Sequence, residues 1–142
     1  MGFSVSGSTA ILFIAMFVSF GVMYTASYNG FERVSDAKGE EMDQMLTQRN
    51  TELNITDTSY SGGNLTVTVN NTGSTSLDIE DTDVLVNGSY VTDSDIEARD
   101  VDGDVNTTLW LPGETLTVKV NVASPARVKI VTTAGVADTE VL

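Results

Sequence analysis

Hydrophobic and polar positions are distributed very differently along the two parts of the chain. Residues 10–28 carry no Asp, Glu, Lys or Arg, and eight of these 19 residues are Ile, Leu, Phe or Val. Together these eight favour insertion into a bilayer by roughly 2.5–5 kcal/mol. As a helix, the stretch would be about 28 Å long, close to the ~30 Å hydrocarbon core of a membrane. The pattern predicts a transmembrane helix within residues 1–30, anchored by Ile11, Leu12, Phe13, Ile14, Phe17, Val18, Phe20 and Val22.

A cleavable secretory signal is the main alternative for this stretch. Such a signal begins with basic residues, has a shorter apolar core and ends at a small-x-small site. No Lys or Arg precedes the apolar run, although Thr25-Ala26-Ser27 fits a cleavage site. We therefore expect the helix to be retained. Small residues four apart, such as Ala15 and Ser19, permit close pairing of two helices, so self-association stays open.

Residues 31–50 predict a polar continuation of the helix. Apolar side chains fall roughly on one side of it, and Gly39 interrupts the pattern. We interpret this segment as a helical stalk or linker. It either pairs with a second copy or is a solvated spacer, and the sequence leaves both alternatives open.

After residue 50 the pattern changes to alternation of apolar and polar residues, with frequent turn residues. Ser61-Gly62-Gly63 separates two alternating runs, which is typical of a β-hairpin. Asn87-Gly88 suits a type I′ turn, and Pro112-Gly113 marks another turn. Seven or eight short strands at this spacing predict an all-β, immunoglobulin-like β-sandwich over residues 51–142. Its expected core comprises Leu65, Val67, Val69, Trp110, Leu116, Val118, Val120, Val128 and Ile130.

Charge and composition exclude several classes of function. The net charge is −13, and residues 51–142 carry 15 acidic against 4 basic residues. Such a surface repels nucleic acid and is typical of a protein from a high-salt organism. The chain has no His and no Cys, so it lacks the usual general base and thiol nucleophile. We expect no enzyme activity and no cofactor.

The acidic segment of residues 93–104 is the one candidate for cation binding. Asp93, Asp95, Glu97, Asp100, Asp102 and Asp104 offer oxygen donors. An EF-hand loop needs Gly at its sixth and Glu at its twelfth position. Counted from Asp100, these positions hold Val105 and Leu111. We therefore expect a solvated acidic loop and no metal site.

Two features of the sequence imply opposite orientations in the membrane. Arg33 and Lys38 follow the apolar stretch, and by the positive-inside rule they place the C-terminal domain in the cytoplasm. Five Asn-x-Ser/Thr sequons, where about two are expected from composition, favour an exterior, glycosylated surface. Because the two basic residues are interleaved with acidic ones, we give the sequons more weight. The candidate N-glycosylation sites are Asn54, Asn64, Asn70, Asn87 and Asn106.

The uncharged start MGFSVSGSTAILFIAMFVS, the following segment YTASYNGFERVSDAKGEEMDQMLTQRNTELNI and the small sandwich resemble archaellum accessory protein F (FlaF/ArlF) of haloarchaea. The resemblance implies a single-pass protein of the archaellum (the archaeal flagellum) with its sandwich between the cell membrane and the surface layer. It further implies a homodimer that binds surface-layer protein as a stator. Accessory protein G and the filament and motor components would be its other partners.

The main alternative is a filament subunit, either type IV pilin-like or an archaellin. Such a subunit shares the apolar N-terminal helix and the β-rich head. It normally carries a basic leader before its cleavage site, whereas here Gly2 follows only the initiator Met. A more distant alternative is a membrane-tethered solute- or metal-binding module, which the acidic segment alone supports.

Overall fold

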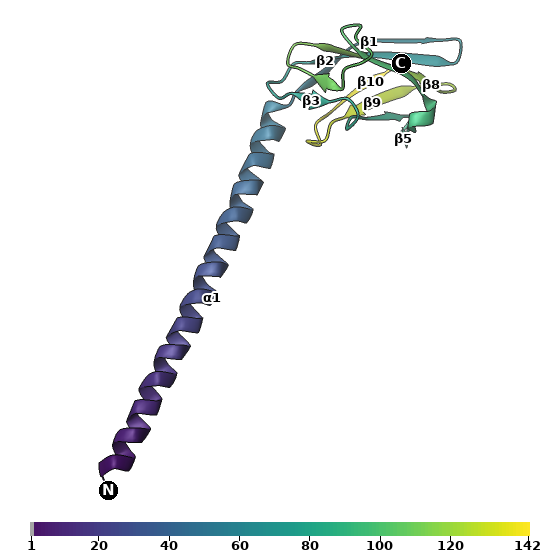
Figure 1. The fold of residues 1–142 in the computed structure, drawn as a ribbon. Coiled ribbons are helices and arrows are strands. Elements are labelled where there is room, and N and C mark those ends of the chain that lie inside the picture. The colour runs from purple at the N-terminus through teal and green to yellow at the C-terminus, as the bar shows by residue number, and fades with distance from the viewer. Residues whose placement is uncertain (1) are drawn as a thin grey trace. The chain divides into compact units, whose positions relative to one another are not determined.

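The computed structural model describes residues 2–142 of the chain, with side chains from residue 5 onward. These residues form two compact units whose boundary falls between Asp43 and Gln44. One helix, α1 (Gly2–Asn50), makes up the first unit and contributes its last seven residues to the second (Figure 1). No proline occurs within α1, and the helix continues through Gly39 without a break.

The second unit is built from short antiparallel strands and one 3-10 turn, η1 (Asp93–Asp95). Three of the strands have only two residues each. The strands are β1 (Leu53–Ser61), β2 (Asn64–Asn71), β3 (Leu77–Asp78), β4 (Asp83–Val86), β5 (Ser89–Tyr90), β6 (Ile96–Val101), β7 (Leu109–Trp110), β8 (Thr115–Asn121), β9 (Arg127–Val131) and β10 (Ala137–Val141).

Two four-stranded sheets form the head. Sheet I has the strand order β1-β2-β8-β6, and sheet II has the order β10-β9-β4-β5. Strands β3 and β7 pair separately. The arrangement confirms the predicted β-sandwich on an N-terminal helix.

The predicted turns are also present. Gly62 and Gly63 join β1 to β2 with φ values of 64° and 91°. Asn87 and Gly88 join β4 to β5 with φ values of 54° and 84°, as a type I′ turn requires. These positive φ values are accessible to Gly and Asn at little steric cost, and they fix the register of the two hairpins.

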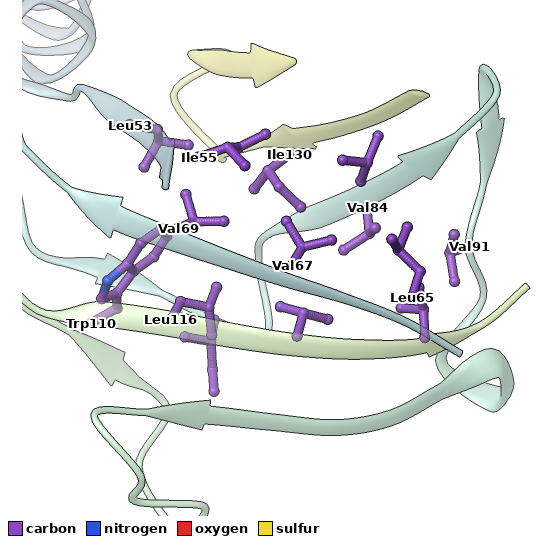
Figure 2. Close-up of a cluster of buried hydrophobic side chains, with 14 of the residues drawn as sticks. Leu53, Ile55, Leu65, Val67, Val69, Val84, Val91, Trp110, Leu116 and Ile130 are labelled. Atoms are coloured by element: carbon purple, nitrogen blue, oxygen red, sulfur yellow. The ribbon is translucent and has the colours of Figure 1, made fainter. Parts of the chain in front are cut away.

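The core lies between the inner faces of the two sheets (Figure 2). All nine residues that alternation assigned to the core expose 1% or less of their surface. The Trp110 ring is fully buried, and its Nε1 donates a hydrogen bond to the Glu114 carbonyl at 2.9 Å. Eight further apolar residues complete the core: Leu53, Ile55, Leu77, Ile79, Val84, Val86, Val91 and Val101.

The expectation of a solvated loop over residues 93–104 was wrong. Residues 96–101 form strand β6, which pairs with β8 and places Val101 in the core opposite Leu116. A bulge between Ile96 and Ala98 shifts the register, so the strand lacks a clean two-residue alternation. Because the strand contains Glu97 and Asp100 and is flanked by further acidic residues, the sequence resembled a loop.

Candidate functional site

The apolar half of α1 has the properties of a membrane anchor. It is the one helix among the described residues that is long and apolar enough to cross a bilayer. The eight predicted anchor residues each expose at least 55% of their surface. Since residues 10–28 carry no charged side chain and are not covered by other described residues, water is an unfavourable surrounding for this stretch.

Three hydroxyl groups within the apolar half are satisfied by the helix itself. Thr9 Oγ1 donates to the Val5 carbonyl at 2.9 Å, and Ser19 Oγ donates to the Ala15 carbonyl at 2.8 Å. Thr25 Oγ1 donates to the Gly21 carbonyl at 3.0 Å. Such i−4 bonds remove the cost of an unpaired hydroxyl in hydrocarbon. The polar residues of the segment are therefore compatible with lipid.

The end of α1 is tied to the head by backbone contacts that sequence analysis did not find. Ser74 N donates to the Asn50 carbonyl at 2.7 Å, and the amides of residues 72 and 73 both donate to the Glu52 carbonyl at 3.0 Å. A Cβ at Gly73 would lie 2.5 Å from Asn50 O and from Glu52 N. Only glycine therefore permits this approach, which we call the helix-end contact (residues 50–52 with 72–74).

The acidic residues of segment 93–104 each have a local structural role. Asp100 Oδ1 accepts a hydrogen bond from Gly103 N, and Asp102 Oδ1 accepts one from Thr115 N. Asp104 Oδ1 accepts one from Asn106 N at 2.8 Å. Carboxylates that cap turns in this way are already engaged. The described residues contain no group of three His, Cys, Asp or Glu side chains that could hold a metal ion.

Asp95 Oδ2 accepts a hydrogen bond from Thr92 Oγ1 at 2.8 Å, and ion pairs hold Asp93 and Glu97. Lys119 Nζ lies 2.7 Å from Glu97 Oε2, and Arg99 Nη2 lies 3.4 Å from Asp93 Oδ1. The hydrogen bond from Lys119, helped by one from Asn64, lowers the pKa of Glu97 from its ordinary value of 4.5. Because Glu97 is exposed, solvent screens this pair.

The outer face of sheet I is polar and carries three of the five sequons. Asn54 and Asn70 are directly paired on β1 and β2, and Asn70 is paired with Thr115 on β8. Asn64 is paired with Asn121, and its Nδ2 donates to Glu97 Oε2 at 3.0 Å. Asn54 is exposed, whereas Asn64 and Asn70 are half-buried.

The other two sequons lie in loops. Asn87 Nδ2 donates to the Ser124 carbonyl at 3.2 Å, and Asn87 Oδ1 accepts hydrogen bonds from the amides of Ala126 and Arg127. Its amide therefore holds the loop that precedes β9, and a glycan would replace one of the two hydrogens of the Nδ2 group that donates to Ser124. Asn106 is exposed and forms one long bond, 3.4 Å, to Asp104.

The outer face of sheet II differs in chemistry from that of sheet I. Tyr90, Leu85, Lys129 and Thr139 lie opposite one another on β5, β4, β9 and β10 and therefore share this face. Arg127, paired with Val141, lies on the same face. Sequence analysis did not single out this surface, because its residues come together only through the pairing of four strands.

Comparisons with known proteins give the family of the chain. The family model described as "Archaeal-type flagellin" matches residues 2–141. No curated protein sequence matches. Among solved structures, the archaellum periplasmic stator protein FlaG from Sulfolobus acidocaldarius is similar, with 19% identity and a TM-score of 0.51. That match covers 65% of this chain and 99% of FlaG. A complex of FlaF and FlaG from the same organism matches with 18% identity and a TM-score of 0.49, covering 65% of this chain and 89% of that one.

The extent of these matches decides what they establish. The FlaG match, at this identity, establishes that the head shares the FlaG fold. The family match spans both the helix and the head, and it confirms the archaellum resemblance drawn from the sequence. The chain belongs to the archaeal-type flagellin family.

Proposed function

We propose that this protein is a membrane-anchored structural component of the archaellum motor, a stator-like accessory protein of the F/G type. The observation that carries the proposal is the combination, in a chain of this family, of an apolar helix long enough to cross a bilayer with a head of FlaG fold. The FlaG structure is named as that of an archaellum periplasmic stator protein. The proposal extends that role to the present chain.

A stator needs two attachments, one to the membrane and one to a static structure outside it. Torque on a filament is dissipated unless some component is held immobile, and a membrane helix alone drifts within the bilayer. In the helix-end contact, one backbone hydrogen bond reaches Asn50, the last residue of α1, and two reach Glu52, which follows the helix. The head would then hold the static lattice, which we propose to be surface-layer protein.

We propose a single-pass topology with residues 1–30 in the cell membrane and the sandwich outside the cytoplasm. The uncovered apolar surface and the internally satisfied hydroxyls of α1 support the membrane location. The exposed sequons Asn54 and Asn106 support an exterior head. Arg33 and Lys38 remain the opposing feature, so the topology needs a direct measurement.

The partners follow from the family resemblance. Besides surface-layer protein, we propose accessory protein G, the filament and motor components and a second copy of this chain. No catalytic role is proposed, because a chain without His and Cys lacks the groups on which most nucleophilic and acid–base catalysis depends.

Binding to surface-layer protein tests the proposal. The full chain, purified from membranes in mild detergent, is immobilised and incubated with purified surface-layer protein in high salt. Retention at molar salt is the expected result, because a stable static contact must survive the protein's native environment. If the immobilised chain retains no surface-layer protein at any salt concentration, the result contradicts the stator assignment. A chain with Gly73→Ala, in which the head is expected to be less stable, serves as a comparison for binding that depends on a folded head.

A filament subunit is the second candidate, and one observation favours it. The matched family model is that of flagellins, and it spans both the helix and the head. Quantitative mass spectrometry of sheared, purified filaments distinguishes the two functions. A subunit is a major component of the filament and lacks residues from its N-terminus. A stator stays with the membrane fraction and keeps its apolar helix.

A further inference from the structure

Basic side chains are rare in the head, and two of them are concentrated on one face. Residues 51–142 hold four basic residues against 15 acidic ones. Arg99 and Lys119 belong to sheet I and are occupied by ion pairs with Asp93 and Glu97. Arg127 and Lys129 are both exposed on β9, two residues apart and therefore on the same face of sheet II.

Neither Arg127 nor Lys129 has an anionic partner within residues 5–142. The ion pairs formed there are those of Arg99 and Lys119 alone, and no side-chain hydrogen bond from Arg127 or Lys129 is formed. In a head with a charge of −11, two cations without internal partners are unexpected. Their charge is available to an external anion.

The two cations border a pocket of about 170 Å³. Leu85, Gly88 and Thr139 form the rest of its lining. Gly88 has no side chain, and a Cβ built there would lie 4.0 Å from Arg127 Nη2, so the guanidinium borders open space. The volume of this pocket is that of about five water molecules, which is enough for the carboxylate group of an acidic side chain.

Apolar surface lies beside the cations. Tyr90 is 57% exposed, and Val141, opposite Arg127, is 72% exposed. Arg and aromatic side chains are enriched in protein-binding surfaces, where both charge pairing and desolvation contribute. A lipid headgroup or a free anion would use the charge but not these apolar side chains.

We propose that the outer face of sheet II, formed by Tyr90, Leu85, Lys129, Arg127 and Val141, is a docking surface for a carboxylate-rich segment of another protein. Charge complementarity selects this occupant. The face offers two cations, a pocket that they border and apolar side chains on either side of them, whereas the outer face of sheet I is polar and carries three sequons. The inference depends on the charge distribution of the head and not on the stator role.

The docking surface is tested with the full chain in phosphatidylcholine nanodiscs and a short fluorescent oligoglutamate peptide. Fluorescence anisotropy is measured in salt of about 0.1 M and about 1 M, where the screening length falls from about 10 to about 3 Å. Oligoglutamine of equal length reports binding that is independent of charge. The expected result is saturable binding of oligoglutamate that weakens at least about tenfold in R127Q/K129Q, as loss of close charge pairs requires.

Matched variants distinguish binding at the outer face of sheet II from an effect of the net charge of the head. R99Q/K119Q also removes two positive charges, but from sheet I, and this variant is expected to bind the peptide like the wild type. R127K/K129R keeps both positive charges on sheet II and is expected to retain binding. Circular dichroism checks the fold of each variant. Equal weakening in R99Q/K119Q, or no binding by the wild type, overturns the proposal. Preferential, R127Q/K129Q-sensitive binding of phosphatidylglycerol vesicles also overturns it and assigns the face to lipid.

Discussion

Replacing Gly73 with alanine is expected to strain the helix-end contact. The new Cβ would lie 2.5 Å from Asn50 O, 2.5 Å from Glu52 N and 3.1 Å from the Thr51 carbonyl carbon. Comfortable contacts between such atoms are about 3.5 Å, so the two segments must separate by roughly 1 Å. The clashing atoms belong to the backbone and cannot rotate away.

The expected loss in the free energy of unfolding has two sources: the overpacking, and the hydrogen bonds that are stretched when the two segments separate. Three backbone hydrogen bonds, of 2.7, 3.0 and 3.0 Å, close the contact. Overpacking costs about 1–3 kcal/mol, and each stretched bond adds a fraction of its roughly 1 kcal/mol. We expect the free energy of unfolding of the head to fall by about 2 kcal/mol. For a unit of this size, that loss lowers the Tm by roughly 8–16 °C.

Near-ultraviolet circular dichroism of the full chain in detergent follows this transition through the buried Trp110. Hydrogen exchange at the amides of residues 72–74 is expected to accelerate in the same variant. Gly39→Ala is the matched control, because nothing lies within 4 Å of that glycine and alanine favours the helix. The steric reasoning is refuted if Gly73→Ala melts within about 2 °C of the wild type.

Three other substitutions test the packing and electrostatics of the head. Trp110→Ala leaves a large cavity between the sheets and is expected to cost about 3–5 kcal/mol in urea unfolding; a loss below 1 kcal/mol contradicts its place in the core. Asn87→Ala removes the bonds to residues 124–127, and hydrogen exchange there should accelerate at least about fivefold. Lys119→Gln is expected to return the Glu97 pKa toward 4.5 in an NMR titration. Because the Glu97 pKa is lowered on folding, its contribution to stability is present above pH 4.5 and is lost as the pH falls through the lowered value. A Glu97 pKa that does not change in the variant contradicts the pairing.

Alternation predicted the sandwich because its inner faces obey a two-residue period. Leu65, Val67 and Val69 on β2 lie beside Leu116, Val118 and Val120 on β8, in register and fully shielded from solvent. The turns were also predictable, because the positive φ values at Gly62, Gly63, Asn87 and Gly88 select residue types that are visible in the sequence. These are local properties of the chain.

Features that depend on distant segments were not predictable. Strand β6 was not recognised, because its bulge interrupts the two-residue alternation and because its acidic residues are typical of loops. Its pairing with β8 makes it an edge strand of sheet I. The role of Gly73 arises because residues 50–52 approach it, and no local pattern distinguishes this glycine from one in an open turn. The face around Lys129 exists only because β9 lies between β4 and β10. Alternation does not predict which strands become neighbours.

The location of the head relative to the membrane is the central claim, and cysteine labelling in intact cells tests it most directly. Because the chain has no native Cys, Ser76→Cys, at an exposed loop position, introduces a single reactive thiol. A membrane-impermeant maleimide applied to whole cells, with lysed cells as the reference for full reactivity, reports which side the thiol occupies. The account predicts that the protein stays in carbonate-washed membranes and is labelled in intact cells to the same extent as after lysis. Labelling that appears only after lysis would place the head in the cytoplasm and contradict the account.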